Sequence, residues 1–294
     1  MRVRKAAPLP RRLRFGPGPC LRIRQSQRYF GAAAGSQGQQ HYGFTLHRPQ
    51  THTLHVRWDG VGDFAIQRGR AIIAQARKGA PWGEFRDVLL SNILAFALLE
   101  QGVETLHASA VEIGGRAVLF AGRPGSAKST LAALFVRRGG RVLTDDLLPL
   151  HPSGKRILAY PSLSEIKLTP AAARALGVRW RQCFPVSPRL RKRVWRARAA
   201  RGPRPLAALY FPVLSRRSRR VVLRPLSHRE AFRALLSHNF NAVLVTRRRM
   251  RRLFALCTQI AQSVPARRLV IPRGWKNLDA VARRIEADLK QLRG

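Results

Sequence analysis

Nine residues in the middle of the chain have the composition of a phosphate-binding loop. Residues 122–130 read Gly-Arg-Pro-Gly-Ser-Ala-Lys-Ser-Thr, close to the pattern G-x-x-x-x-G-K-[ST] that follows a strand and opens a helix. Glycines let the backbone N–H groups of such a loop turn inward around a phosphate. Lys128 is expected to reach the β- and γ-phosphates, and the Ser129 hydroxyl to ligate Mg²⁺. The predicted nucleotide-binding residues are Gly122, Arg123, Pro124, Gly125, Ser126, Ala127, Lys128, Ser129 and Thr130.

One position departs from this pattern, because Ala127 stands where the second glycine belongs. If the backbone needs a positive φ there, the extra Cβ costs on the order of 1 kcal/mol. The competing interpretation of the whole segment is a plain Gly/Ser turn that caps a helix.

Acidic residues are scarce, and an adjacent pair follows the loop closely. Asp145-Asp146 end an apolar run, at a place where a carboxylate can order Mg²⁺ beside a phosphate loop. Glu165 is the only acid between Asp146 and Glu230, and His107 lies at the start of the strand two before the loop. The alternatives are a helix cap or turn for the Asp pair, a solvated loop residue for Glu165 and a structural histidine for His107.

The elements that would position these residues are readable from periodicity. Residues 106–113 alternate as a strand, Gly114-Gly115 is a two-residue hairpin signal, and residues 116–122 are a second, more apolar strand. A helix over 129–139 and a strand over 141–146 follow. This order predicts an α/β core with a parallel pair of strands on either side of the helix.

The flanking segments differ in character. Residues 1–41 indicate a loose basic leader with one strand near Leu21–Ile23, and residues 42–104 a small β-rich lobe followed by a helix over 84–101. Residues 105–294 form the predicted catalytic domain, in which the Arg- and Pro-rich segment 178–204 is expected to be a flexible insertion. Ser227 and Glu230 predict a capping box at the start of a helix over 228–238.

Net charge is the most unusual bulk property. The chain has 56 Lys and Arg residues against 14 Asp and Glu, a formal charge of +42, and only eight of the basic residues are Lys. A scattered excess of Arg is typical of drift in a GC-rich genome; the functional interpretation is an anionic partner such as nucleic acid, bound without specificity at low salt.

The cysteines make a reducing cytoplasm the expected location of the chain. Cys20, Cys183 and Cys257 are far apart and form no metal-binding spacing. The most apolar stretch, Val88–Leu99, is too short to span a bilayer, and the basic N-terminus lacks the apolar run of a signal peptide. No membrane span is expected, and homo-oligomerisation stays open.

Two stretches, LHASAV and GRPGSAKSTLAALFVRRGGRVLTDD, together resemble the catalytic core of HPr kinase/phosphorylase and its relatives. The resemblance covers about residues 105–170 and continues through PLAALYF, AFRALL and RRLVIP. It implies a P-loop-containing HPr kinase/PEP carboxykinase-like core, with ATP and Mg²⁺ as cofactors and a protein or peptide serine as acceptor. Where the family has a Glu followed by an Arg-Gly run, this chain reads Ser-Glu-Ile-Lys, which puts the reverse, phosphorolytic reaction in question.

The resemblance also implies residue roles. His107 and Asp146 would handle the proton of the acceptor hydroxyl, with Lys128 and Ser129 on ATP and Mg²⁺, and Asp145 and Glu165 near the metal. Two alternatives remain: a P-loop ATPase or nucleotide-sensing regulator without phosphotransfer, and a basic nucleic-acid-binding protein with a vestigial loop.

Overall fold

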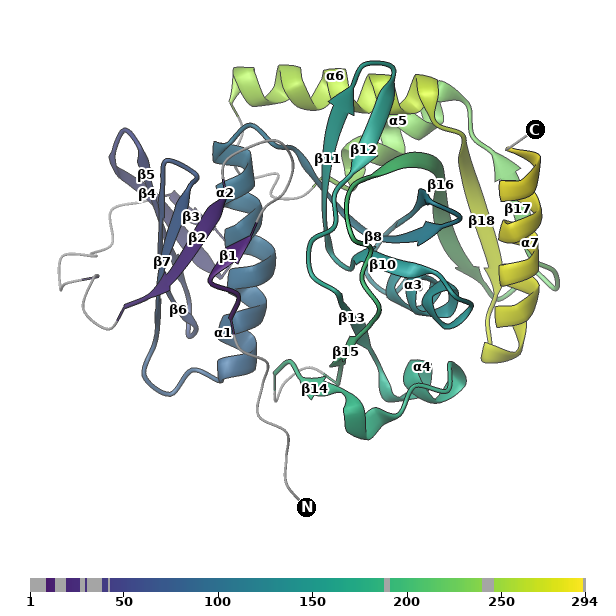
Figure 1. Cartoon of the computed structure of the whole chain (residues 1–294), viewed down its shortest axis with the longest axis horizontal. Helices are drawn as coiled ribbons and strands as arrows, with labels where there is room; N and C mark the ends of the chain where they lie inside the picture. The colour runs from purple at the N-terminus through teal and green to yellow at the C-terminus, as the bar shows by residue number, and fades with distance from the viewer. Residues whose placement is uncertain are drawn as a thin grey trace. The chain divides into compact units, whose positions relative to one another are not determined.

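The computed structural model describes residues 9–13, 20–26, 30, 39–41, 43–187, 191–239 and 246–292 (Figure 1). The chain divides into two compact units. Unit 1 comprises Met1–Val103 with Phe184–Arg193, and unit 2 comprises Glu104–Cys183 with Val194–Gly294. Both mix sheets with helices, so the α/β class expected from the sequence is observed.

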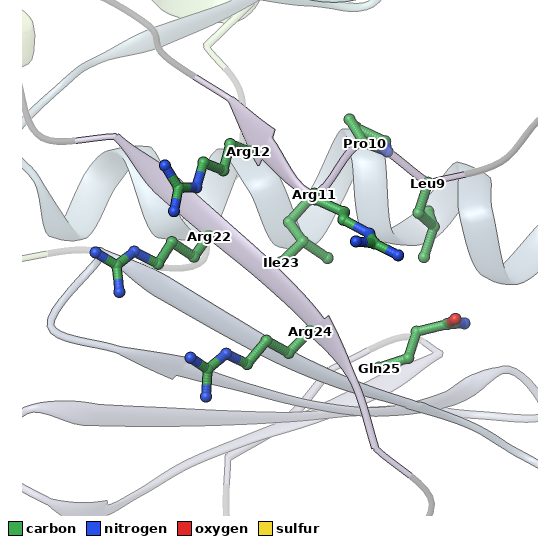
Figure 2. Close-up of a pocket in the computed structure, with 8 residues that line it drawn as sticks. All are labelled: Leu9, Pro10, Arg11, Arg12, Arg22, Ile23, Arg24 and Gln25. Atoms are coloured by element: carbon green, nitrogen blue, oxygen red, sulfur yellow. The ribbon is translucent and has the colours of Figure 1, made fainter.

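Unit 1 is built on a seven-stranded sheet. Its order is β1-β2-β7-β6-β5-β4-β3, in which β2 and β7 are parallel and the other pairs antiparallel. In the antiparallel pair of β1 and β2, Arg12 lies opposite Arg22 (Figure 2). The strands are β1 (Arg12–Leu13), β2 (Leu21–Gln25), β3 (Gln39–His41), β4 (Phe44–Gln50), β5 (Thr53–Trp58), β6 (Gly62–Gln67) and β7 (Ala71–Ala76), and unit 1 also holds β14 (Phe184–Pro185).

A helical segment covers one face of this sheet. It consists of α1 (Trp82–Val88), the π-helical turn η1 (Leu89–Ile93) and α2 (Leu94–Glu100), which confirms the helix predicted over 84–101. Alternate strand residues face it, so that Phe64 stacks on Phe85 at 5.4 Å between ring centroids. The apolar run Val88–Leu99 is therefore part of a core, and no helix in the described part of the chain is long and apolar enough to cross a membrane.

Unit 2 contains the larger sheet. Its path is β10-β8-β11-β12-β16-β18-β17, and β9 pairs with β8 on one side and β16 on the other. The strands are β8 (Thr105–Ile113), β9 (Arg116–Ala121), β10 (Arg141–Thr144), β11 (Leu147–Ser153), β12 (Arg156–Ala159), β16 (Arg204–Ser215), β17 (Val222–Pro225) and β18 (Ala266–Pro272).

The expected parallel pair is arranged differently from the sequence prediction. β8 pairs antiparallel with both β9 and β10, so it lies between them instead of leaving them adjacent. The reason is the hairpin at Gly114-Gly115, which pairs β8 with one edge of β9. That edge of β9 is therefore already occupied when the chain reaches β10, and β10 pairs with β8. The parallel neighbour of β9 is β16, which in turn pairs parallel with β18.

Helices cover both faces of the unit 2 sheet (Figure 1). On one face Phe120 of β9 stacks between Phe135 and Tyr210, at centroid distances of 5.9 and 6.0 Å. On the other face Leu119 and Leu209 pack in the core with Leu235. The first face carries α3 (Lys128–Arg137), α4 (Pro170–Ala175) and α7 (Leu278–Gln291), and the second carries α5 (His228–Ser237) and α6 (Arg247–Ser263).

Local signals fix several of these boundaries. The Ser227 hydroxyl accepts from the Glu230 backbone N–H while the Glu230 carboxylate accepts from the Ser227 N–H, which confirms the capping box. The segment 178–204, expected as a flexible insertion, contains η2 (Trp180–Gln182), β14 and β15 (Arg193–Arg196), and residues 188–190 lie outside the described residues. The leader expected over 1–41 includes β1, β2 and β3, and its residues 1–8, 14–19, 27–29 and 31–38 also lie outside them.

Candidate functional site

The loop at 122–127 joins the end of β9 to the start of α3. A Cβ on Gly122 would lie 2.5 Å from the Ser126 Oγ, so the closed turn leaves no room for a side chain there. Gly125 has φ +81°, a left-handed conformation that glycine adopts without cost. Arg123, Pro124 and Gly125 are exposed, so the outer side of the loop faces solvent.

Ala127 adopts the conformation that the motif requires of a glycine. Its φ is +74° and its ψ +16°, in the left-handed region, at the residue before α3 begins. An L-residue with a Cβ pays roughly 1–2 kcal/mol for this conformation. The loop therefore keeps the backbone path expected for the motif in spite of the substitution.

Lys128 is folded back over this loop. Its side chain is 6% exposed, and its Nζ donates hydrogen bonds to the carbonyl oxygens of Gly122, at 2.8 Å, and Arg123, at 3.3 Å. The ammonium group is thus held at the centre of the turn. The first backbone N–H groups of α3, a helix of 10 residues, add a positive partial charge at the same place.

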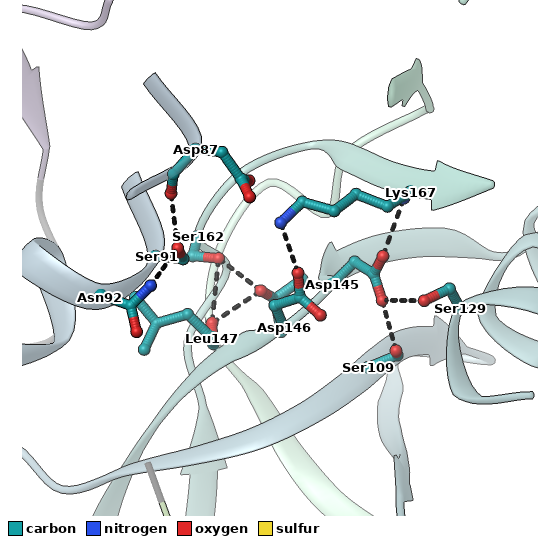
Figure 3. Close-up of polar contacts among 11 residues, drawn as sticks. Asp87, Ser91, Asn92, Ser109, Ser129, Asp145, Asp146, Leu147, Ser162 and Lys167 are labelled. Carbon is teal, nitrogen blue, oxygen red and sulfur yellow. Dashed lines mark hydrogen bonds and ion pairs between the residues drawn. The ribbon is translucent and has the colours of Figure 1, made fainter. Parts of the chain in front are cut away.

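Asp145 ties the start of α3 to two strands. Its Oδ1 accepts from the Ser129 hydroxyl at 2.9 Å and from the Ser109 hydroxyl of β8 at 2.5 Å, and its Oδ2 accepts from the Lys167 backbone N–H at 2.8 Å (Figure 3). Burial, and then the neighbouring Asp146, raise the pKa of Asp145 to about 6, although the hydrogen bonds from the Ser109 hydroxyl and the Lys167 backbone act to lower it. The carboxylate is thereby fixed beside the Ser129 hydroxyl.

Asp146 points to a cation instead. Its Oδ2 lies 2.7 Å from the Lys167 Nζ, on the strand β13 (Glu165–Leu168). Its backbone has φ +79°, a conformation that Asp tolerates better than most residues, and its carbonyl accepts from the Ala108 N–H at 3.2 Å. The sharp turn between β10 and β11 therefore aims the two adjacent carboxylates at different partners.

His107 belongs to the same neighbourhood. Burial lowers its pKa, the Asp146 charge opposes that effect, and the charges of Lys128 and Lys167 lower the pKa further. The structure thus brings together four residues that the sequence separates by up to 60 positions: His107, Lys128, Asp146 and Lys167.

Glu165 has a different partner among the described contacts. Its Oε1 lies 3.7 Å from the Arg196 Nε. Ile166 and Leu168 are buried in the core, so Glu165 and Lys167 share the opposite face of β13. No cluster of three or more His, Cys, Asp or Glu side chains spaced to hold a metal occurs among the described residues.

Sequence analysis missed two residues of this site, Ser109 and His238. It noted Lys167, in the stretch Ser-Glu-Ile-Lys, but predicted no side-chain partner for it. Ser109 could have been found, because it lies two positions after His107 and so on the same face of one strand. His238, at the end of α5, had no sequence signal. Its carbonyl accepts from the His107 N–H at 2.9 Å, its ring stacks on Phe211 at 6.1 Å, and burial followed by the charges of Lys128, His107 and Arg123 lowers its pKa to about 4.

Comparison with known proteins gives likeness to solved structures but no match to a family model or a curated protein. The solved structure of the Hpr(Ser) kinase/phosphatase from Coxiella burnetii is similar to this chain with a TM-score of 0.34 and 13% sequence identity, over 64% of this chain and 97% of that one.

Proposed function

We propose that this protein is an ATP-dependent phosphotransferase that transfers the γ-phosphoryl group of ATP to a serine hydroxyl of a protein or peptide, as a kinase resembling HPr kinase. One observation carries the proposal. The Asp145 carboxylate accepts a hydrogen bond from Ser129 at the first turn of α3, next to a buried Lys128 that is held against the glycine loop.

The residues of the loop fit a nucleoside triphosphate and a divalent cation. The left-handed backbone at Gly125 and Ala127 is the kind of local conformation that turns successive backbone N–H groups toward an anion. Lys128 would hold the β- and γ-phosphates, and Ser129 with Asp145 would ligate Mg²⁺, with Glu165 as a further candidate ligand. Mg²⁺ in such sites is held by few protein oxygens plus phosphates and water, and neutralises the charge that develops on the phosphates.

Asp146 is the proposed general base. It accepts the proton of the acceptor hydroxyl while the hydroxyl oxygen bonds to the γ-phosphorus, and the bond from that phosphorus to the bridging oxygen of ADP breaks. Lys167, 2.7 Å from Asp146, stabilises the negative charge of this carboxylate and offers a second cation to the transferring group.

Both histidines act as neutral groups in this scheme. Burial, and then nearby cations, lower the pKa values of His107 and His238, so the fold favours the neutral form of both rings near Lys128. A neutral His107 can donate its one ring N–H to the oxygen of the acceptor hydroxyl, while the single hydrogen of that hydroxyl points to Asp146.

The experiment is transfer of label from γ-³²P-ATP to protein in lysate of the host at near-physiological salt. The wild type should label a protein band that Lys128→Ala and Asp146→Asn abolish, whereas Lys155→Ala, which changes an exposed lysine in a turn, should label normally. Lys128-dependent release of free phosphate without labelled protein would contradict transfer and indicate ATP hydrolysis. No Lys128-dependent signal of either kind would contradict the proposed function altogether.

A further inference from the structure

A second charged site lies in unit 1, at the strands β1 and β2. A pocket of about 500 Å³, in the usual size range of ligand pockets, is lined by four arginines and by no acidic residue. Figure 2 shows the side chains of Arg12, Arg22 and Arg24 extending to the same side of the two strands, and that of Arg11 extending away from them. All four are exposed.

The register explains the alignment of the three arginines. Arg12 is the direct cross-strand partner of Arg22, so their side chains leave the sheet on the same face, and Arg24 follows two residues later on that face. Like charges directly opposite one another destabilise a strand pair. The repulsion between Arg12 and Arg22 therefore destabilises the pair of β1 and β2.

Nothing next to these arginines compensates that cost. The partners of Arg22 and Arg24 on the neighbouring strand β7 are Ala71 and Ile73, which carry no charge. The nearest acid on the same face, Asp63 of β6, is paired with Arg57 at 2.7 Å. No ion pair joins Arg12, Arg22 or Arg24 to an acid within the described part of the chain. These three exposed arginines are therefore available to an anionic partner.

We propose that this arginine row, Arg12, Arg22 and Arg24, is a docking site for an acidic, extended segment of a partner protein. Arg22 and Arg24 are about 7 Å apart along the strand, at two residues of about 3.3 Å each, which equals the spacing of alternate side chains in an extended peptide. Guanidinium groups bind carboxylates through paired hydrogen bonds.

The same lining disfavours nucleic acid as the occupant. Single-stranded nucleic acid is bound without sequence preference by stacking of bases on aromatic rings beside a basic groove. None of the residues that line this pocket is aromatic. The site is independent of the phosphotransferase proposal, because the binding needs neither ATP nor the residues of unit 2.

The test is fluorescence anisotropy with the full chain and a labelled peptide of alternating Glu and Ala, about 12 residues long, at near-physiological salt. We expect binding that Arg12→Gln/Arg22→Gln/Arg24→Gln weakens about tenfold. The charge-matched control Arg216→Gln/Arg217→Gln/Arg219→Gln, in an exposed loop of unit 2, should weaken it less than about twofold. Arg12→Lys/Arg22→Lys/Arg24→Lys keeps the charge and should still weaken binding, because Lys lacks the paired donors.

Three outcomes would overturn the proposal. Absence of peptide binding by the wild type would mean that the row is not a site for an acidic peptide. Equal losses in both Gln triple variants would mean that only bulk charge acts. A single-stranded oligonucleotide of similar length that binds through these three arginines, while the peptide does not, would assign the row to nucleic acid. The Lys triple variant keeps the test decisive if the Gln triple variant does not fold.

Discussion

At Ala127 the loop has the left-handed backbone conformation of the motif's glycine but carries a Cβ atom. Its φ of +74° favours glycine, so Ala127→Gly should remove a strain of roughly 1–2 kcal/mol and lose roughly 0.5–1 kcal/mol through the greater freedom of the unfolded chain. We expect a net stabilisation of about 0.5 kcal/mol, measured by urea denaturation.

The matched control is Ala255→Gly, at an exposed position inside α6 where the backbone is helical. This change should destabilise by about 0.5–1 kcal/mol, since glycine is a poor helix former. If both substitutions moved the urea midpoint in the same direction, the assignment of strain to Ala127 would be wrong.

His238 predicts a pH dependence of stability. Its pKa falls from about 6.5 in an unfolded chain to about 4 in the fold, so below pH 6.5 the unfolded state binds more protons. The free energy of unfolding should therefore drop as pH falls from 6.5 to 4, by about 1–2 kcal/mol from this group after allowance for its partial exposure. His238→Gln should flatten that part of the curve.

Urea denaturation at a series of pH values measures the effect. His52→Gln, which changes an exposed histidine in a turn of unit 1, is the control. A wild-type curve whose slope between pH 6.5 and 4 survives His238→Gln unchanged would contradict a depressed pKa at this residue.

Residue spacing predicted the contacts that are local along the chain and missed those made by distant strands. The loop, Lys128 and Ser129 lie in one continuous motif, and the acid pair follows it within about 20 residues, so patterns of short range were sufficient. Lys167 and His238 approach Asp146 and His107 only because β13 and the end of α5 are placed there by the tertiary fold. No short-range periodicity encodes that placement.

At the scale of elements, a buried ion pair joins the start of β8 to α6. The side chains of Glu104 and Arg249 are 3% and 4% exposed, with Oε2 and Nε 3.4 Å apart, and Arg249 also donates to the Asn239 side chain at 3.1 Å. Because Asn239 follows His238 and forms a bridge with Leu106, this pair supports the segment that contacts His107.

Breaking the ion pair on one side should cost far more than replacing both partners. Glu104→Leu leaves Arg249 buried without its carboxylate, and we expect a loss of about 3–5 kcal/mol. The double variant Glu104→Leu/Arg249→Met should recover most of that loss, because neither charge is then buried alone.

A double-mutant cycle by urea denaturation checks this prediction. Asp63→Asn breaks the more exposed pair with Arg57 and should cost no more than about 1 kcal/mol. Additive losses from the two changes at Glu104 and Arg249 would contradict a coupled, buried pair.

Strand order shows where element prediction from sequence reaches its limit. Strands over 106–113, 116–122 and 141–146 were predicted from alternation and apolar runs, and β8, β9 and β10 occupy nearly these ranges. The pairing partners of these strands were not predictable, because the apolar pattern of a strand does not determine which strand pairs with each of its edges. The placement of β16 beside β9, about 90 residues later in the chain, is a consequence of the whole core.

At the scale of the whole molecule, the charge of +42 should oppose folding through self-repulsion. Raising NaCl from about 0.05 M to about 0.5 M shortens the screening length to a few ångströms, and we expect the melting temperature to rise by about 5 °C. Differential scanning fluorimetry measures it, with glucose at equal osmolality as the uncharged control. A melting temperature that falls with NaCl would mean that attractive ion pairs outweigh the repulsion.

The central claim is that the glycine loop, Lys128 and the Asp145–Ser129 pair form an ATP site, and calorimetric titration of the whole chain with ATP tests it most directly. The account predicts binding that requires Mg²⁺ for full affinity, falls at least about tenfold in Lys128→Ala and is unchanged in Lys155→Ala. Absence of ATP binding by the wild type with Mg²⁺ present, or equal affinities for wild type and Lys128→Ala, would contradict it.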